Sequence, residues 1–154
     1  MLPDVNVLVA AFRQDHPHHR VAADWLNEAL TIKADGQLML LPVGVISSFL
    51  RLVTQPKIFP VPTPIENAVD FIDWLLENPR VKLPSIGSNA GNKANNEWEA
   101  MRSLVLRKQL SANQIPDAQL AAMSISLSEP FITFDKGFRQ LLPPSLLLVL
   151  RAAS

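Results

Sequence analysis

The sequence contains no cysteine. This absence excludes disulfide bonds, cysteine-ligated zinc sites and a cysteine nucleophile. No apolar run reaches the roughly 18–20 residues that a helix needs to cross a bilayer, so we expect no membrane span. The N-terminus has no basic segment before an apolar stretch, and Asp4 interrupts the apolar residues there, which does not match a signal peptide. We therefore expect a soluble, cytoplasmic protein.

Charged residues are also scarce, at 18% of the sequence, and 14 Lys and Arg residues balance 14 Asp and Glu residues. A neutral protein does not hold nucleic acid by bulk charge, although a local basic patch is compatible with this composition. Hydrophobic residues make up 48% of the 154 residues, which is typical of a folded protein. The length predicts a single domain over residues 1–154.

The pattern of apolar residues predicts helices alternating with short strands. Strands are expected at 37–41, 81–83, 131–134 and 146–150, and helices at 18–31, 43–54, 65–77, 97–110 and 116–127. Turns or loops are expected at 15–19, 55–64 and 85–96, a short helix or turn at 136–142, and the apolar run 2–12 fits either strand or helix. This alternation is typical of an α/β layer fold with a mostly parallel sheet.

Three aspartates lie in apolar surroundings: Asp4 in MLPDVNVLVAAF, Asp117 in QIPDAQLAAM and Asp135 in PFITFDKGF. A carboxylate beside the core is costly unless it is paired, hydrogen-bonded or bound to a cation. Strand ends and helix starts meet at one edge of a parallel sheet, and acids gathered there suit Mg²⁺ or Mn²⁺. Each residue also has a structural alternative: Asp117 in a helix dipole, Asp135 in a turn, and Asp4 as a buried acceptor.

Four segments, read in order, resemble the PIN-domain ribonucleases, and specifically the VapC toxins of bacterial toxin–antitoxin pairs: DVNVLVAAFRQDHPHH, FLRLVTQPKIF, IPDAQLAAMSI and FITFDKGF. The resemblance implies a three-layer α/β/α fold around a parallel sheet, metal-dependent endonucleolytic cleavage of RNA (tRNA or rRNA), and a cognate antitoxin protein. It matches Asp4, Asp117 and Asp135 to the family's metal-binding acids. It matches Asn6 and Thr133 to neighbours that position the acids or the attacking water, and it places a helical start at residues 5–12.

One position departs from this family pattern. Ser48 stands where the family commonly has a glutamate in the helix before the Leu-Arg segment. The site then has three acids, which favours one tightly held divalent ion. Ser48 either holds a metal-bound water through its hydroxyl or is a helix-surface serine. The departure keeps open a rival interpretation, a catalytically impaired PIN-fold protein that binds RNA or an antitoxin without cleavage.

A second rival is a phosphoryl-transfer domain with a carboxylate nucleophile. Such a domain needs a lysine after a later strand, but Arg151 follows the last predicted strand, which disfavours it. For the ribonuclease, Arg51, Lys136 and Arg139 are the cations expected to contact RNA phosphates, and the last two flank Asp135.

Other conspicuous residues have structural interpretations. We expect the three histidines of the HPHH cluster to face solvent at a helix start, and the three tryptophans to pack in the core or at a subunit interface. The apolar residues around the proline-rich loop are either core or a face for a homodimer or an antitoxin; they are Phe49, Leu50, Leu52, Ile58 and Phe59. We expect the protein to form a homodimer.

Overall fold

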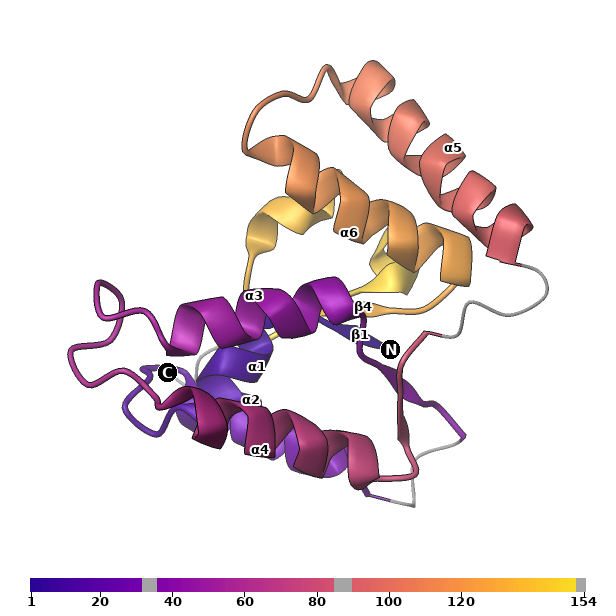
Figure 1. The fold of residues 1–154 in the computed structure, drawn as a ribbon. Helices are drawn as coiled ribbons and strands as arrows, with labels where there is room; N and C mark the ends of the chain where they lie inside the picture. The colour runs from indigo at the N-terminus through magenta and orange to yellow at the C-terminus, as the bar shows by residue number, and fades with distance from the viewer. Residues whose placement is uncertain (32–35, 85–89, 152–154) are drawn as a thin grey trace. The chain divides into compact units, whose positions relative to one another are not determined.

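The computed structural model describes residues 1–31, 36–84 and 90–151 (Figure 1). The chain divides into two compact units. The first unit consists of Met1, residues 3–84 and the residues from 150 onward. The second unit consists of Leu2 and residues 85–149. No helix in the described ranges combines the length and the apolar character that a membrane span requires.

The first unit is mainly helical. Its elements are α1 (Val5–Phe12), α2 (His19–Ala29), β2 (Met39–Leu40), α3 (Val43–Val53), α4 (Ile65–Glu77) and β3 (Val81–Lys82). Helix α1 packs against α2 and α3, and α3 packs against α4. Strands β2 and β3 pair in parallel, with Met39 opposite Val81. The helices that connect these strands make the parallel pairing possible, because parallel strands need a crossover.

The core of the first unit explains why α1 is a helix although its sequence is almost uniformly apolar. Every residue from Val7 to Ala11 is buried, so the helix is covered on most sides, as expected for a central element. Beside it, the Phe49 ring lies 5.5 Å from the Phe12 ring and 5.4 Å from the Phe71 ring, centroid to centroid. Phe49 is fully buried and Phe59 nearly so, so these two residues are core and do not form an exposed apolar face.

The second unit contains Leu2 of β1 (Leu2–Pro3) and every element that follows β3, up to β5. These are α5 (Ala90–Lys108), α6 (Gln114–Leu127), β4 (Phe131–Thr133), the 3₁₀ helices η1 (Lys136–Gln140) and η2 (Pro144–Leu146), and β5 (Leu147–Val149). Strand β4 is the middle strand: β5 pairs with it in parallel, and the Leu2 amide donates to the Pro130 carbonyl at 2.7 Å. Helix α5 packs along α6 (Figure 1).

Most of the expected elements are confirmed to within a few residues, but one expectation is wrong. Residues 90–96, expected as loop, belong to helix α5, while residues 85–89 of the same expected loop lie outside the described ranges. Extending an existing helix costs far less than nucleating one, so the apolar part of α5 carries its Gly- and Asn-containing start. Helix α6 begins at Gln114, slightly before its expected start at Pro116. The proline is tolerated in the first turn because first-turn amides have no intrahelical acceptor.

Two of the three tryptophans are surface residues. Trp74 is 52% exposed and Trp98 is 57% exposed, whereas Trp25 is half-buried. Core packing is therefore wrong for Trp74 and Trp98, and the interface alternative stays a prediction. A helix in a small protein leaves an aromatic ring on its outer face when the inner face is already filled by smaller residues, here Ala68, Ile72 and Leu75 of α4.

Candidate functional site

Asp4 is placed by the junction of β1 and α1. It is the residue before the first turn of α1, and its carbonyl accepts from the amides of Val7 at 3.0 Å and Leu8 at 3.4 Å. The residue is 6% exposed. Because α1 is buried along its length, the position of Asp4 is fixed by the packing of the whole helix.

Asn6 and Ser48 belong to the same unit as Asp4. Asn6 lies half-buried in the first turn of α1 and lines a pocket of about 450 Å³. Ser48 lies half-buried midway along α3. Arg51, one turn further along α3, is exposed, so its guanidinium is accessible to a charged ligand.

The second unit holds the other two acids close enough to influence each other. Asp117 is in the first turn of α6, and its pKa is raised above the ordinary value, first by burial and then by the charge of Asp135. Repulsion of this kind is relieved when a cation binds between the two carboxylates. Carboxylate oxygens are also the ligands that Mg²⁺ and Mn²⁺ prefer. The pair therefore fits a divalent metal by its chemistry.

Asp135 is held in one orientation by its own loop. The carboxylate Oδ1 accepts from the Gly137 amide at 2.7 Å, and the Asp135 amide donates to Thr133 Oγ1 at 2.9 Å. Thr133 is fully buried at the end of β4, so the hydroxyl fixes the start of the loop. A Cβ atom at Gly137 would lie 3.0 Å from Oδ1, which shows how closely the backbone approaches the carboxylate. Lys136 and Arg139 follow in η1 and are exposed.

The structure thus pairs two of the predicted acids and places the third, Asp4, in the first unit. Among the described residues, no three or more His, Asp and Glu side chains form a ready metal-binding cluster. Ser48 and Arg51 lie in the same unit as Asp4. Thr133, Lys136 and Arg139 lie in the unit that contains the acid pair.

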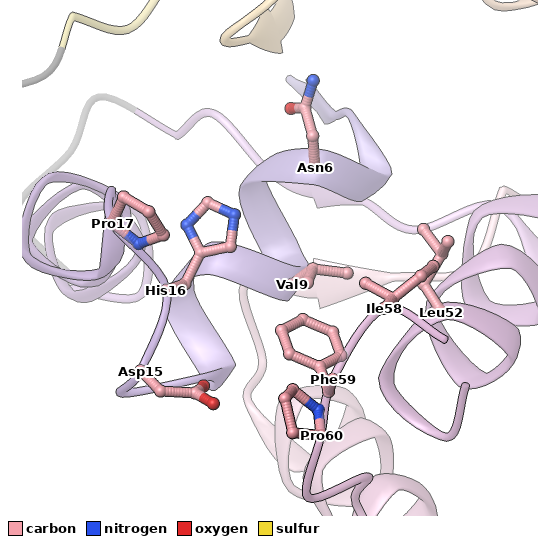
Figure 2. Close-up of a pocket in the computed structure, with 9 residues that line it drawn as sticks. All are labelled: Asn6, Val9, Asp15, His16, Pro17, Leu52, Ile58, Phe59 and Pro60. Atoms are coloured by element: carbon pink, nitrogen blue, oxygen red, sulfur yellow. The ribbon is translucent and has the colours of Figure 1, made fainter. Parts of the chain in front are cut away.

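The pocket beside Asn6 was not predicted from the sequence. His16 of the histidine cluster is one of the residues that form it. His16 was expected to face solvent, but it is half-buried and lines the pocket together with Asp15 and the loop residues Ile58 and Phe59 (Figure 2). The signal was present in two polar or proline-rich segments, QDHPHH and PKIFP, that each contain aromatic side chains. Their convergence could not be read from either segment alone.

The first unit also contains an arginine that sequence analysis passed over. Arg13 donates to both carboxylate oxygens of Asp15, at 2.9 and 2.6 Å. It also donates to the Val61 carbonyl at 2.9 Å and to Thr63 Oγ1 at 3.0 Å. These bonds join the end of α1 to the loop that follows α3, so Arg13 fixes one side of the pocket.

Comparison with known proteins gives consistent results. The family model for the PIN domain matches residues 1–141. Ribonuclease VapC31 and Ribonuclease VapC25 of Mycobacterium tuberculosis are each 34% identical over 137 residues, 89% of this chain and 89% of each relative. Ribonuclease VapC43 of the same organism is 32% identical over 135 residues, 88% of this chain and 85% of the relative.

A solved structure shows the same fold. In the crystal structure of VapBC2 from Rickettsia felis bound to a DNA fragment from their promoter, one chain matches with a TM-score of 0.65 and 14% identity, covering 97% of this chain and 98% of that one. This likeness confirms the expected fold class, the three-layer α/β/α fold with a parallel sheet. Together with the family match and the relatives above 30% identity, it leads to one conclusion: the chain belongs to the PIN domain family.

Proposed function

We propose that the protein is a metal-dependent endoribonuclease and the toxin of a toxin–antitoxin pair. The observation that carries the proposal is the acid pair of the second unit, in which burial and then the charge of Asp135 raise the pKa of Asp117. The names of the relatives, VapC ribonucleases, supply the reaction class. Asp117, Asp135 and Asp4 would hold Mg²⁺ or Mn²⁺.

When bound, the ion polarises the phosphate and makes water a stronger nucleophile at neutral pH. The chain's own residues supply orientation. The Gly137 amide and the Thr133 hydroxyl fix Asp135, and burial of α1 fixes Asp4. Asn6 and Thr133 position the acids or the attacking water, and Lys136, Arg139 and Arg51 attract the RNA backbone.

The test is cleavage of a mixed tRNA and rRNA pool by purified, antitoxin-free protein in Mg²⁺, in Mn²⁺ and in EDTA. We expect discrete cuts with either metal and none in EDTA. Asp4→Ala and Asp135→Ala should abolish the cuts, whereas Asp70→Ala, which removes an exposed aspartate of α4, should not. Circular dichroism checks that each variant is folded; cleavage by Asp135→Ala at the wild-type rate would contradict the site.

The second candidate is an RNA- or antitoxin-binding protein that does not cut. Ser48 favours it, because the glutamate expected there by family resemblance is missing. A calorimetric titration with Mn²⁺ and the cleavage assay together separate the two functions. The enzyme binds the ion, loses that binding in Asp135→Ala and cuts RNA, whereas the non-cutting protein binds the ion weakly or not at all and gives no cuts in any pool. Ser48→Glu is the matching gain-of-function variant, and it should increase cleavage if the missing acid limits the rate.

Two partners belong to the same proposal: a cognate antitoxin protein and a second copy of this chain, both in the cytoplasm. Trp74 in the first unit and Trp98 in the second are exposed, and each is an apolar side chain that such a contact would cover. Sedimentation of the purified chain, alone and with the antitoxin, gives the masses of both assemblies; a monomer that stays monomeric at high concentration would refute the homodimer.

A further inference from the structure

The pocket that contains Asn6 is built from one unit of the chain. Its walls come from α1, from the turn after α1, from the end of α3 and from the loop that follows; the lining residues are Asn6, Val9, Asp15, His16, Pro17, Leu52, Ile58, Phe59 and Pro60 (Figure 2). The volume is about 450 Å³, which lies in the range of small-ligand sites. We refer to it as the α1 pocket.

The α1 pocket is pre-formed because Arg13 braces it from behind. The guanidinium bonds to the lining residue Asp15 and, outside the lining, to the backbone and side chain of the 61–63 segment, which directly follows the lining residues 58–60. It also lies 4.2 Å from the centroid of the Phe59 ring, so the ring is held in place by a cation–π contact. A ligand entering the pocket therefore meets ordered walls and does not have to organise them.

The polar groups of the lining are directional, and the one carboxylate among them is paired with an arginine beside the pocket. Asp15 is balanced by Arg13. The His18 amide donates to His16 Nδ1 at 3.1 Å, so Nδ1 is an acceptor and the proton of the neutral ring sits on Nε2. Burial, followed by the charge of His18, lowers the pKa of His16, which keeps the ring neutral. The Asn6 carboxamide offers both donors and acceptors.

This combination selects a flat, uncharged ligand. Pro17, Phe59 and Pro60 present flat apolar surfaces, and the His16 ring lies between Pro17 and Asn6 in Figure 2. A phosphate would gain nothing from a neutral pocket with a carboxylate at its edge. A nucleobase has two apolar faces and an edge of donors and acceptors, which are the features that proteins use to bind splayed-out RNA bases.

The α1 pocket belongs to the same unit as Asp4. Asn6 is two residues beyond Asp4, in the first turn of the same helix. We propose that the α1 pocket receives one unstacked nucleobase of the RNA substrate, with His16 reading its edge. This inference rests on the proposed ribonuclease function and adds a base-binding site to it.

The test blocks the pocket without touching an acid. Ile58 is 49% exposed, so Ile58→Trp adds bulk at the pocket mouth without overfilling the core. Val61→Trp is the matched control, because Val61 is 75% exposed on the same loop but does not line this pocket. Both variants, and wild type, are assayed on a short cleavable RNA and on copies with one base removed at each position in turn.

We expect base removal at one position to lower kcat/KM of wild type about 5- to 160-fold, the range for losing one stacked base. Ile58→Trp should show the same loss on the intact RNA and no further loss on that abasic copy. Val61→Trp should behave as wild type. His16→Ala, which removes the edge contact, should change the preferred base at that position. If Ile58→Trp retains wild-type kcat/KM, or the full abasic effect, the proposal is wrong.

A binding measurement separates this inference from the ribonuclease proposal. Anisotropy of the labelled RNA in EDTA needs no cleavage. Suppose wild type cuts no RNA, and Ile58→Trp weakens binding of the intact oligonucleotide but not of the abasic copy. The pocket proposal is then supported and the ribonuclease proposal is wrong. If all proteins bind alike, the pocket proposal fails. If Ile58→Trp loses a protein partner while its RNA binding and cleavage are unchanged, the occupant is a protein side chain and the nucleobase assignment is overturned.

Discussion

Replacing Arg13 with alanine should destabilise the protein by about 2 kcal/mol. The largest part is the bond to Thr63 Oγ1, because Thr63 is 8% exposed and a buried hydroxyl that loses its partner costs about 1–2 kcal/mol. The cation–π contact with the Phe59 ring, at 4.2 Å, adds about 0.5–1 kcal/mol. The Val61 carbonyl lies on the surface, where water replaces the lost donor.

Asp15 should contribute much less than its short bonds to Arg13 suggest. Its side chain is 55% exposed, so water and salt screen the pair. Hydrogen bonding from Arg13 does lower the pKa of Asp15. Asp15→Asn is therefore the matched control: it weakens the ion pair but leaves the bonds from Arg13 to the 61–63 segment.

Urea unfolding at neutral pH measures both variants. With a slope of about 1–3 kcal/mol per M, the loss in Arg13→Ala corresponds to a midpoint lower by about 1 M. The difference should persist at high salt, because a neutral hydroxyl is the main partner. The reasoning is refuted if Arg13→Ala keeps the wild-type midpoint, or if Asp15→Asn loses as much.

Three further predictions concern the acid pair and the core. Asp117→Asn should stabilise metal-free protein near neutral pH, since burial and Asp135 raise the pKa of Asp117. The folded state then holds the Asp117 proton more tightly, so wild-type stability falls as the pH rises above the ordinary pKa of 3.8, and the variant lacks this fall. Thermal unfolding in EDTA from acid to neutral pH measures how stability changes with pH in both proteins. An equal change with pH in both proteins would contradict the prediction. Gly137→Ala should lower ribonuclease activity without shifting the urea midpoint, because the new Cβ would sit 3.0 Å from Asp135 Oδ1; cleavage at the wild-type rate would show that the carboxylate tolerates the shift. Phe49→Ala should cost about 3–5 kcal/mol by urea unfolding, because Phe49 is 0% exposed, and a loss below about 1 kcal/mol would mean that the ring is not part of the core.

Local patterns were sufficient for most of the helices. Apolar residues three and four apart mark α4 so clearly that the predicted range, 65–77, is the observed one. The prediction of a loop at residues 90–96 was wrong, because it considered their local composition and not the helix that follows them. The Gly- and Asn-rich residues 90–96 look like a loop by themselves, but they extend a helix whose later turns pack on α6.

The candidate site was predictable only in part. Asp4, Asp117 and Asp135 could be selected because each carboxylate interrupts an apolar segment, and family resemblance then assigned them a common role. Their mutual influence is a tertiary property: Asp117 and Asp135 come from a helix and a strand end, and only the fold of the second unit brings their charges close enough to interact.

The sequence by itself determined the α/β alternation, the absence of thiol chemistry and the choice of candidate acids, because these depend on residue type and short-range periodicity. The tertiary structure decided the pairing of the carboxylates, the burial of His16 and the brace from Arg13 to Thr63. Those features depend on where distant segments meet. That meeting is set by the packing of whole elements and leaves no local signature in the residues that make the contact.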